Sequence, residues 1–142
     1  MIAIPDKFGT EVGWRGWRVE VRHDQPLLYS VIHKIAWPPN TPMEAYCGKS
    51  HTPPAPRCMC GLYAARSLEH LCEIAYHTHG ALGEVHLWGT VVPGQLGWRA
   101  QYGYPSRLFV PHTAWRLVEP LQKTYGVPVK LMNPYNPGGA IV

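Results

Sequence analysis

Alternating apolar and polar residues indicate two of the strands that this chain is expected to form. Every second side chain is apolar in residues 17–22 and 83–92, as in a strand with one buried face. In the second segment, Val85, Leu87 and Val91 fall on one side of the strand. Both segments are therefore expected to lie in a sheet that covers an apolar core.

Further segments predict strands because they combine β-branched and aromatic residues with flanking turn residues. They are residues 27–37, 98–104, 107–110 and 127–132. His23 to Pro26 is expected to turn the chain between the first two strands, and Pro93 to Gly97 is expected to join residues 83–92 to a partner strand. Gly89 favours a bulge, or a close approach of another backbone.

Helical spacing appears twice. Between Ser67 and Gly80, the apolar residues Leu68, Leu71 and Ala75 recur at intervals of three and four. Ser67 suits the N-cap of this helix, and Gly80 suits the position after its end. A second helical pattern covers residues 113–125, where an internal proline predicts a kink or two short helices.

These elements predict an α+β fold with a mainly antiparallel sheet of about five or six strands, two helical segments and a zinc-stapled loop. The length of 142 residues is that of one domain. Residues 1–132 are expected to form this domain. Residues 133–142, which contain two prolines and two glycines, are expected to form an irregular C-terminal tail.

Composition adds a candidate binding surface. Only 15% of residues are charged, whereas the chain holds 6 Trp and 8 Tyr, so some aromatic side chains are expected at the surface. The net charge of +4 permits an acidic partner such as nucleic acid, although no basic run concentrates it. No apolar run is long enough to cross a bilayer and the first residues lack a secretory signal, so a cytoplasmic protein is expected.

Three of the four cysteines lie with one histidine in a single proline-rich stretch. Cys47, His51, Cys58 and Cys60 form a Cys-x3-His-x6-Cys-x-Cys set, and three thiolates with one imidazole are a donor set that Zn²⁺ takes in closed tetrahedral sites. Three prolines after the histidine restrict φ and remove backbone donors. The sequence therefore predicts a semi-rigid loop held by Zn²⁺.

Other interpretations of these cysteines stay open at this point. Cys58 and Cys60 would also suit buried thiols, a redox pair or a disulfide, and one intervening residue is fewer than most zinc sites have. His51 would also suit a solvated loop position. The fourth cysteine, Cys72, falls on the apolar face of the first predicted helix and is interpreted as a core thiol.

A repeated Gly-Trp-Arg motif and a later Gly-Trp-Arg motif are candidates for recognition of nucleic acid or a protein partner, because aromatic rings stack on bases and guanidinium groups bind phosphate. The candidate residues are Trp14, Arg15, Trp17, Arg18, Trp98 and Arg99. In the alternative interpretation, the tryptophans pack in the core of a sheet and the arginines face water.

The middle of the chain resembles a small uncharacterised family of actinobacterial and actinophage proteins, over residues 37 to about 109. The resemblance rests on residues 58–64, which fit a Cys-x-Cys-Gly-(Ile/Leu)-Tyr-Ala motif, and on residues 83–91, residues 97–100 and Tyr104-Pro105. It implies a cytoplasmic protein of bacterial or phage origin in which the Cys-x-Cys loop is a family feature. It implies no substrate and no catalytic residue.

Two classes of function follow. In the favoured one, the protein is a non-enzymatic, zinc-stapled binding module that recognises nucleic acid or a host protein. In the alternative, it is a hydrolytic enzyme with a metal-activated water and a carboxylate such as Glu44 or Glu69 as proton carrier. Four protein ligands leave no position for that water, and the sequence has no His-Glu-x-x-His, phosphate-loop or Gly-x-Ser-x-Gly motif. The oligomeric state does not follow from the sequence.

Overall fold

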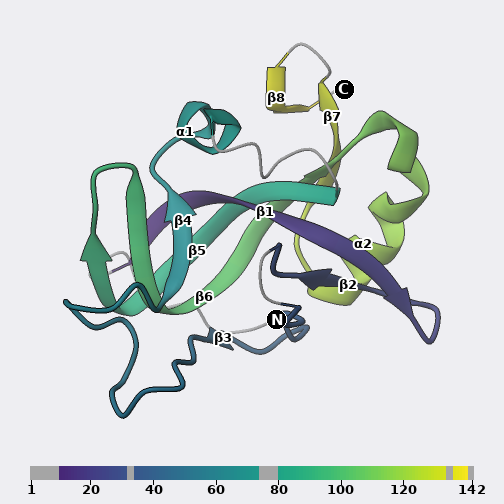
Figure 1. Ribbon diagram of the computed structural model, residues 1–142. Helices are drawn as coiled ribbons and strands as arrows, with labels where there is room; N and C mark the ends of the chain where they lie inside the picture. The colour runs from purple at the N-terminus through teal and green to yellow at the C-terminus, as the bar shows by residue number, and fades with distance from the viewer. Residues whose placement is uncertain (1–9, 32–33, 74–79, 134–135, 141–142) are drawn as a thin grey trace.

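The computed structural model describes residues 10–31, 34–73, 80–133 and 136–140 (Figure 1). In chain order, its elements are β1 (Glu11–Arg22), β2 (Gln25–Tyr29), β3 (Met43–Glu44), β4 (Leu62–Ala65), α1 (Leu68–Glu73), β5 (Gly80–Pro93), β6 (Gly97–Val110), the 3-10 helix η1 (His112–Leu117), α2 (Val118–Tyr125), β7 (Val129–Asn133) and β8 (Asn136–Ala140). The α+β class and the mainly antiparallel sheet are confirmed. No helix in the described ranges is long and apolar enough to cross a membrane.

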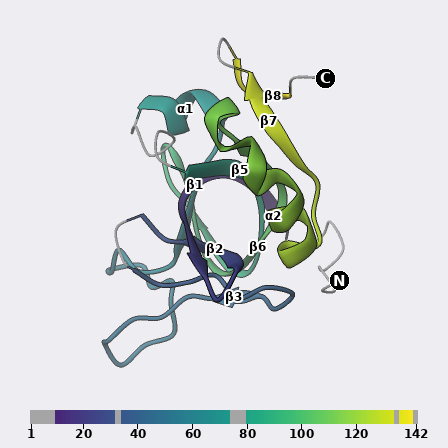
Figure 2. The same cartoon turned by 90° about the vertical axis from the view of Figure 1, so that its right-hand side faces the viewer.

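Four strands close into a ring. Strand β1 pairs with β5, β5 with β6, β6 with β4, and β4 again with β1, all antiparallel. Figure 2 looks along this ring, with α2 beside it. Strands β2 and β3 extend it from β1 and β6, and β7 joins β6 in parallel.

Bulges in β5 help the ring to close, because a bulge bends a strand and increases its twist. The β5–β6 register shifts between Glu84 and Val85 and again between Trp88 and Val91. Gly89 lies in the second shift with φ at +78°, a conformation that glycine adopts without strain. The bulge expected at Gly89 is confirmed.

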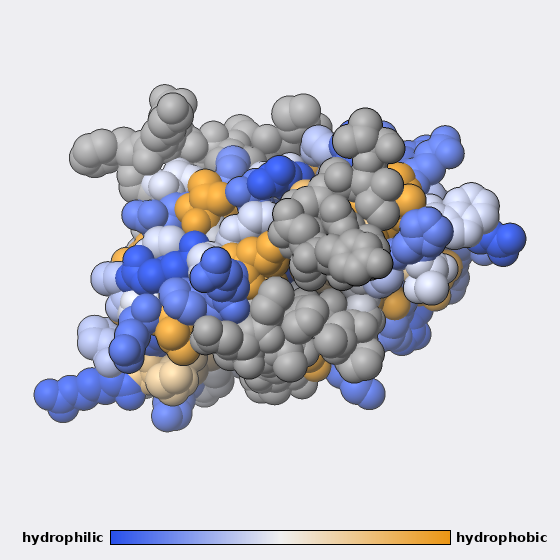
Figure 3. Space-filling view, turned by 90° about the horizontal axis from the view of Figure 1, so that it is seen from above, coloured by the Kyte–Doolittle hydropathy of each residue, from blue (hydrophilic) through white to orange (hydrophobic). Residues whose placement is uncertain are grey.

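The apolar core fills this curved sheet. The residues expected on one side of β5, Val85 and Leu87, are fully buried together with Trp17 of β1. Helix α2 covers the core with its buried residues Leu121 and Tyr125. On the face seen from above, apolar residues appear as separate patches among hydrophilic ones (Figure 3).

Several expected boundaries differ from those observed. The strand expected over residues 27–37 ends at Tyr29, and among the residues described in this range a single bridge from Tyr29 to Ala36 continues it. Residues 98–110 form one strand instead of two. Gly80 is the first residue of β5, where a Cβ atom would lie 2.2 Å from the carbonyl oxygen of Trp17.

The first helix is described only to Glu73. Ser67 caps it as expected, because its Oγ accepts a hydrogen bond from the backbone N–H of His70 at 3.2 Å. Residues 74–79, including Ala75, lie outside the described part of the chain, and nothing is described of the Cys72 side chain.

The second helical region is divided in two, as expected, but not at Pro120. The division falls where η1 gives way to α2 at Val118. Pro120 lies in the first turn of α2, where its missing N–H has no intrahelical partner in any case. The tail expected to be irregular contains strand β8, which pairs with β7 through Met132 and Ala140. This pairing occurs because β7 leaves one edge open to another strand.

The Tyr125 hydroxyl joins three elements, so its removal is expected to destabilise the fold. It accepts a hydrogen bond from the Leu28 backbone N–H at 2.7 Å and donates one to the Trp37 carbonyl at 2.8 Å. Tyr125→Phe leaves both buried backbone groups unpaired, and we expect a loss of about 1–3 kcal/mol in the free energy of unfolding. Urea titration measures this loss, with Tyr46→Phe at an exposed tyrosine as the control. Equal stability of Tyr125→Phe and wild type would contradict the role of this hydroxyl.

Candidate metal centre

All four predicted ligands lie in one long loop between β3 and β4, at the lower left of Figure 1. Both ends of this loop are fixed to strand β6. Glu44 pairs with Tyr102 before the loop, and Leu62 pairs with Ala100 after it. The loop therefore leaves and rejoins the sheet at nearly the same place, which makes it fold back on itself and bring its two halves together.

The donor atoms of Cys47, His51, Cys58 and Cys60 all lie within 4.8 Å of one another. The Sγ atoms of Cys47 and Cys58 are 3.8 Å apart, and His51 Nε2 is 3.3 Å from Cys60 Sγ. Two thiolates bound at about 2.3 Å to one tetrahedral ion would be about 3.8 Å apart. The cluster is therefore of the right size and donor type to hold a metal ion, and the sequence prediction that brings these four residues together is confirmed.

The sulfur atoms are not bonded to one another. A disulfide needs its sulfur atoms about 2.0 Å apart, and Cys47, Cys58 and Cys60 are all free. The disulfide interpretation of the Cys58 and Cys60 pair is therefore wrong for this structure. Cys58 and Cys60 are not joined because their donor atoms lie around a centre that they share with those of Cys47 and His51.

The thiols differ in their readiness to ionise. A hydrogen bond from the backbone of Cys60, followed by one from the Cys60 thiol, lowers the pKa of Cys58 to about 6. Desolvation raises the pKa of Cys60. A metal takes cysteine as the thiolate, so Cys58 is more ready than Cys60 to bind at neutral pH.

Arg99 of β6 binds the backbone of the loop through hydrogen bonds. Its Nη1 atom donates to the backbone carbonyls of Ala55 at 3.3 Å and Cys60 at 2.9 Å, and also to that of Cys58. These bonds fix the backbone of two of the ligands. Strand pairing places Arg99 opposite Tyr63 of β4, just after the loop. No local sequence pattern indicates this role, because Arg99 lies 41 residues after Cys58 and 39 after Cys60.

The two tryptophans of β1 pack against other side chains of the protein and do not form an exposed surface. Trp17 is only 1% exposed and meets Trp37 edge-on, with ring centroids 5.4 Å apart. Trp14 is half-buried, stacks against Phe109 at 6.2 Å and lies under the guanidinium of Arg107. Trp17 therefore follows the alternative interpretation, in which the tryptophans pack in the core of the sheet, because β1 is enclosed in the ring and its alternate side chains point into the core.

The other candidates for partner binding are also engaged within the protein. Arg18 forms an ion pair with Glu20 at 3.3 Å. Trp98 lies 4.6 Å from the guanidinium of Arg66, and Arg15 is bonded to a backbone carbonyl of β4. Arg99 is likewise bonded to the carbonyls of the metal loop. The six candidate residues therefore do not form one exposed face.

Comparison with known proteins gives no relative from which a function could be transferred. No family model, no curated protein and no solved structure matches this chain.

Proposed function

We propose that the protein is a non-enzymatic binding module whose loop is closed by one Zn²⁺ ion. One observation carries this proposal: four protein donors, three sulfurs and one nitrogen, converge within 4.8 Å. Such a set completes the tetrahedral coordination of Zn²⁺ and leaves no position for a reactive water. This argues against the hydrolytic alternative, because metal-activated water needs a vacant coordination position.

Nucleic acid is the partner that the charges of the loop favour. From Ala45 to Leu68 the chain contains no carboxylate, whereas Lys49 and Arg57 are exposed in the loop. Tyr46, 81% exposed, adds an aromatic ring to the same loop. Cations that bind phosphates and a ring that stacks on a base are the usual elements of binding to single-stranded nucleic acid.

The zinc ion would serve this function indirectly. It would fix the loop and so hold Tyr46, Lys49 and Arg57 in one arrangement, which lowers the ordering entropy lost on binding. The resemblance to an actinobacterial and actinophage family adds to the proposal an accessory or regulatory role in a phage or its host.

Fluorescence anisotropy with labelled single- and double-stranded oligonucleotides at several salt concentrations tests the proposal. We expect binding at low salt that weakens as salt rises, because counterions are released. The double variant Lys49→Gln/Arg57→Gln should reduce the slope of log K against log salt by about 1 for each cation removed.

The double variant Lys123→Gln/Lys130→Gln is the matched control, since it removes two exposed cations outside the loop. Its salt slope should stay near that of the wild type. The nucleic-acid proposal is wrong if neither kind of oligonucleotide binds at low salt, or if the two double variants behave alike. Capture of a protein partner with no affinity for oligonucleotides would likewise overturn it.

A further inference from the structure

A cavity of about 480 Å³ lies next to the metal loop. Strands β1 and β4, the segment after β2 and the loop itself form its walls. Most lining side chains are apolar or aromatic, among them Trp14, Met43, Leu62 and Leu71. Its volume and lining are typical of sites for small organic ligands.

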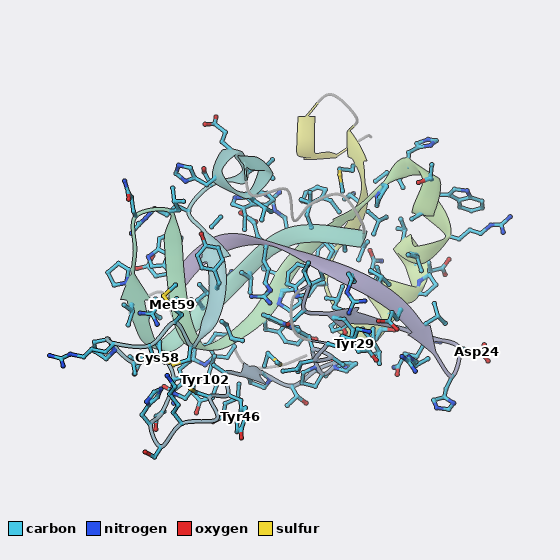
Figure 4. The ribbon with its side chains drawn as sticks, viewed as in Figure 1. Asp24, Tyr29, Tyr46, Cys58, Met59 and Tyr102 are labelled. Carbon is cyan, nitrogen blue, oxygen red and sulfur yellow. The ribbon has the colours of Figure 1, made fainter. Side chains whose placement is uncertain are left out.

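Three exposed apolar side chains belong to the lining. Ile35 is 46% exposed, Tyr46 is 81% exposed and Met59 is 89% exposed. Figure 4 places Tyr46 and Met59 on the loop beside Cys58, at the opposite end of the molecule from Asp24. Large apolar side chains at the mouth of an apolar cavity would gain from covering a ligand, since they are otherwise in water.

Arg15 brings a positive charge into this apolar wall. Its Nη1 donates to the Tyr63 carbonyl at 2.7 Å, its Nη2 to Ser30 Oγ at 3.1 Å, and its guanidinium lies 4.9 Å from the Trp37 ring. All three partners are neutral. Burial lowers the pKa of Arg15 to about 10, which shows that its surroundings disfavour the charge.

No carboxylate compensates this charge within the described residues. The ion pairs found there belong to Arg18, Arg22 and Arg107. Among the residues that line the cavity, Arg99 is bonded to loop carbonyls and Glu44 is exposed. The Nε atom of Arg15 is buried without a hydrogen-bond partner. A partly buried cation without a counter-ion is costly unless an anion binds next to it.

We propose that this cavity binds a small organic anion, made of an apolar body and one carboxylate, with the carboxylate paired to Arg15. The apolar lining would enclose the body, and the planar guanidinium matches the geometry of a carboxylate. A single carboxylate fits better than a phosphate dianion, because the lining holds two arginines and one glutamate and so has a net charge of +1. A dianion would keep an uncompensated negative charge in an apolar site.

The metal loop forms part of this binding site. Met59 and Gly61 line the cavity on either side of Cys60, and Tyr46 precedes Cys47. Loss of the metal would therefore release one wall of the cavity. Ligand binding is expected to be weaker in the metal-free protein, whether or not the loop also binds nucleic acid.

Calorimetric titration with decanoate, and with decan-1-ol as a ligand of equal length without charge, tests the proposal on the full chain. We expect decanoate to bind at least about tenfold more tightly than the alcohol, because a hydrogen-bonded charge pair is stronger than a neutral one. Arg15→Gln should remove this preference and leave the affinity for the alcohol nearly unchanged. Arg66→Gln is the control, since Arg66 also lies on a tryptophan and donates to a carbonyl, but outside the cavity.

A second variant keeps the test independent of how well Arg15→Gln folds. Met59→Glu at the exposed rim should weaken decanoate binding and affect the alcohol much less, whereas Leu96→Glu in the exposed β5–β6 turn should affect neither. The proposal is overturned if decanoate does not bind at millimolar concentration. Equal binding of acid and alcohol, or an unchanged preference in both Arg15→Gln and Met59→Glu, would also overturn it.

Discussion

Cys60→Ser is expected to abolish stoichiometric zinc binding and to open the loop to protease. Serine keeps the size of the side chain but removes a thiolate, leaving three of the four donors. Replacing a residue that only supports a metal ligand already costs about 10–100-fold in affinity, so loss of a ligand itself should cost more. Native mass spectrometry should find one zinc ion in the wild type and none in the variant.

Trypsin reports the state of the loop in the same samples. Lys49 and Arg57 are exposed within it, and cleavage requires the local backbone to open. We expect slow cleavage at both sites in the zinc-bound wild type, and cleavage at least about tenfold faster in Cys60→Ser or after chelation, since the metal no longer opposes opening. The buried core around Trp17 and Leu87 includes none of the four donors, so the rest of the protein should stay folded.

Cys72→Ser is the matched control, because Cys72 lies in α1 outside the cluster of four donors. This variant should keep its zinc and its resistance to trypsin. Zinc retained in Cys60→Ser, or lost from Cys72→Ser, would show that the assigned ligand set is wrong.

Arg99→Met is expected to weaken zinc binding about 10–100-fold, although Arg99 is not a ligand. The substitution keeps much of the aliphatic stem but leaves the carbonyls of Ala55, Cys58 and Cys60 without their common donor. Hydrogen bonds from a charged group contribute about 1.5–3 kcal/mol each, so the loop backbone should lose most of its fixed geometry. Competition with a chelator of known affinity measures the change.

Arg99→Lys should restore only part of the affinity, because all three carbonyls accept from Nη1 and the lysine side chain ends one bond short of that atom. Arg66→Met serves as the control, since Arg66 donates to the Gly94 carbonyl in the β5–β6 turn and not to the metal loop. Arg99 would have no positioning role if Arg99→Met bound zinc as tightly as the control.

The sequence predicted those parts of the structure that depend on local patterns. Alternation located β5 and the buried positions Val85 and Leu87, and ligand spacing located the cluster around Cys58. The turn at His23 and Asp24 was also predicted, and both residues have the positive φ angles of a tight hairpin turn.

Features that depend on strand pairing could not be read in the same way. Alternation shows which face of a strand is buried but not its neighbour, so it did not reveal that β4 closes the ring between β1 and β6. The same pairing places Arg99 next to the metal loop and Arg15 in the wall of the cavity. Both arginines were interpreted as partner-binding residues because sequence shows their charge and not what surrounds it.

The metal assignment itself is tested most directly by zinc K-edge X-ray absorption on the purified, zinc-bound protein. The proposed site requires three sulfur neighbours at about 2.3 Å and one nitrogen at about 2.0–2.1 Å, with no water in the coordination sphere. A bound oxygen or fewer than three sulfurs would contradict the closed site, and a purified protein that takes up no zinc would refute the proposed role of the loop altogether.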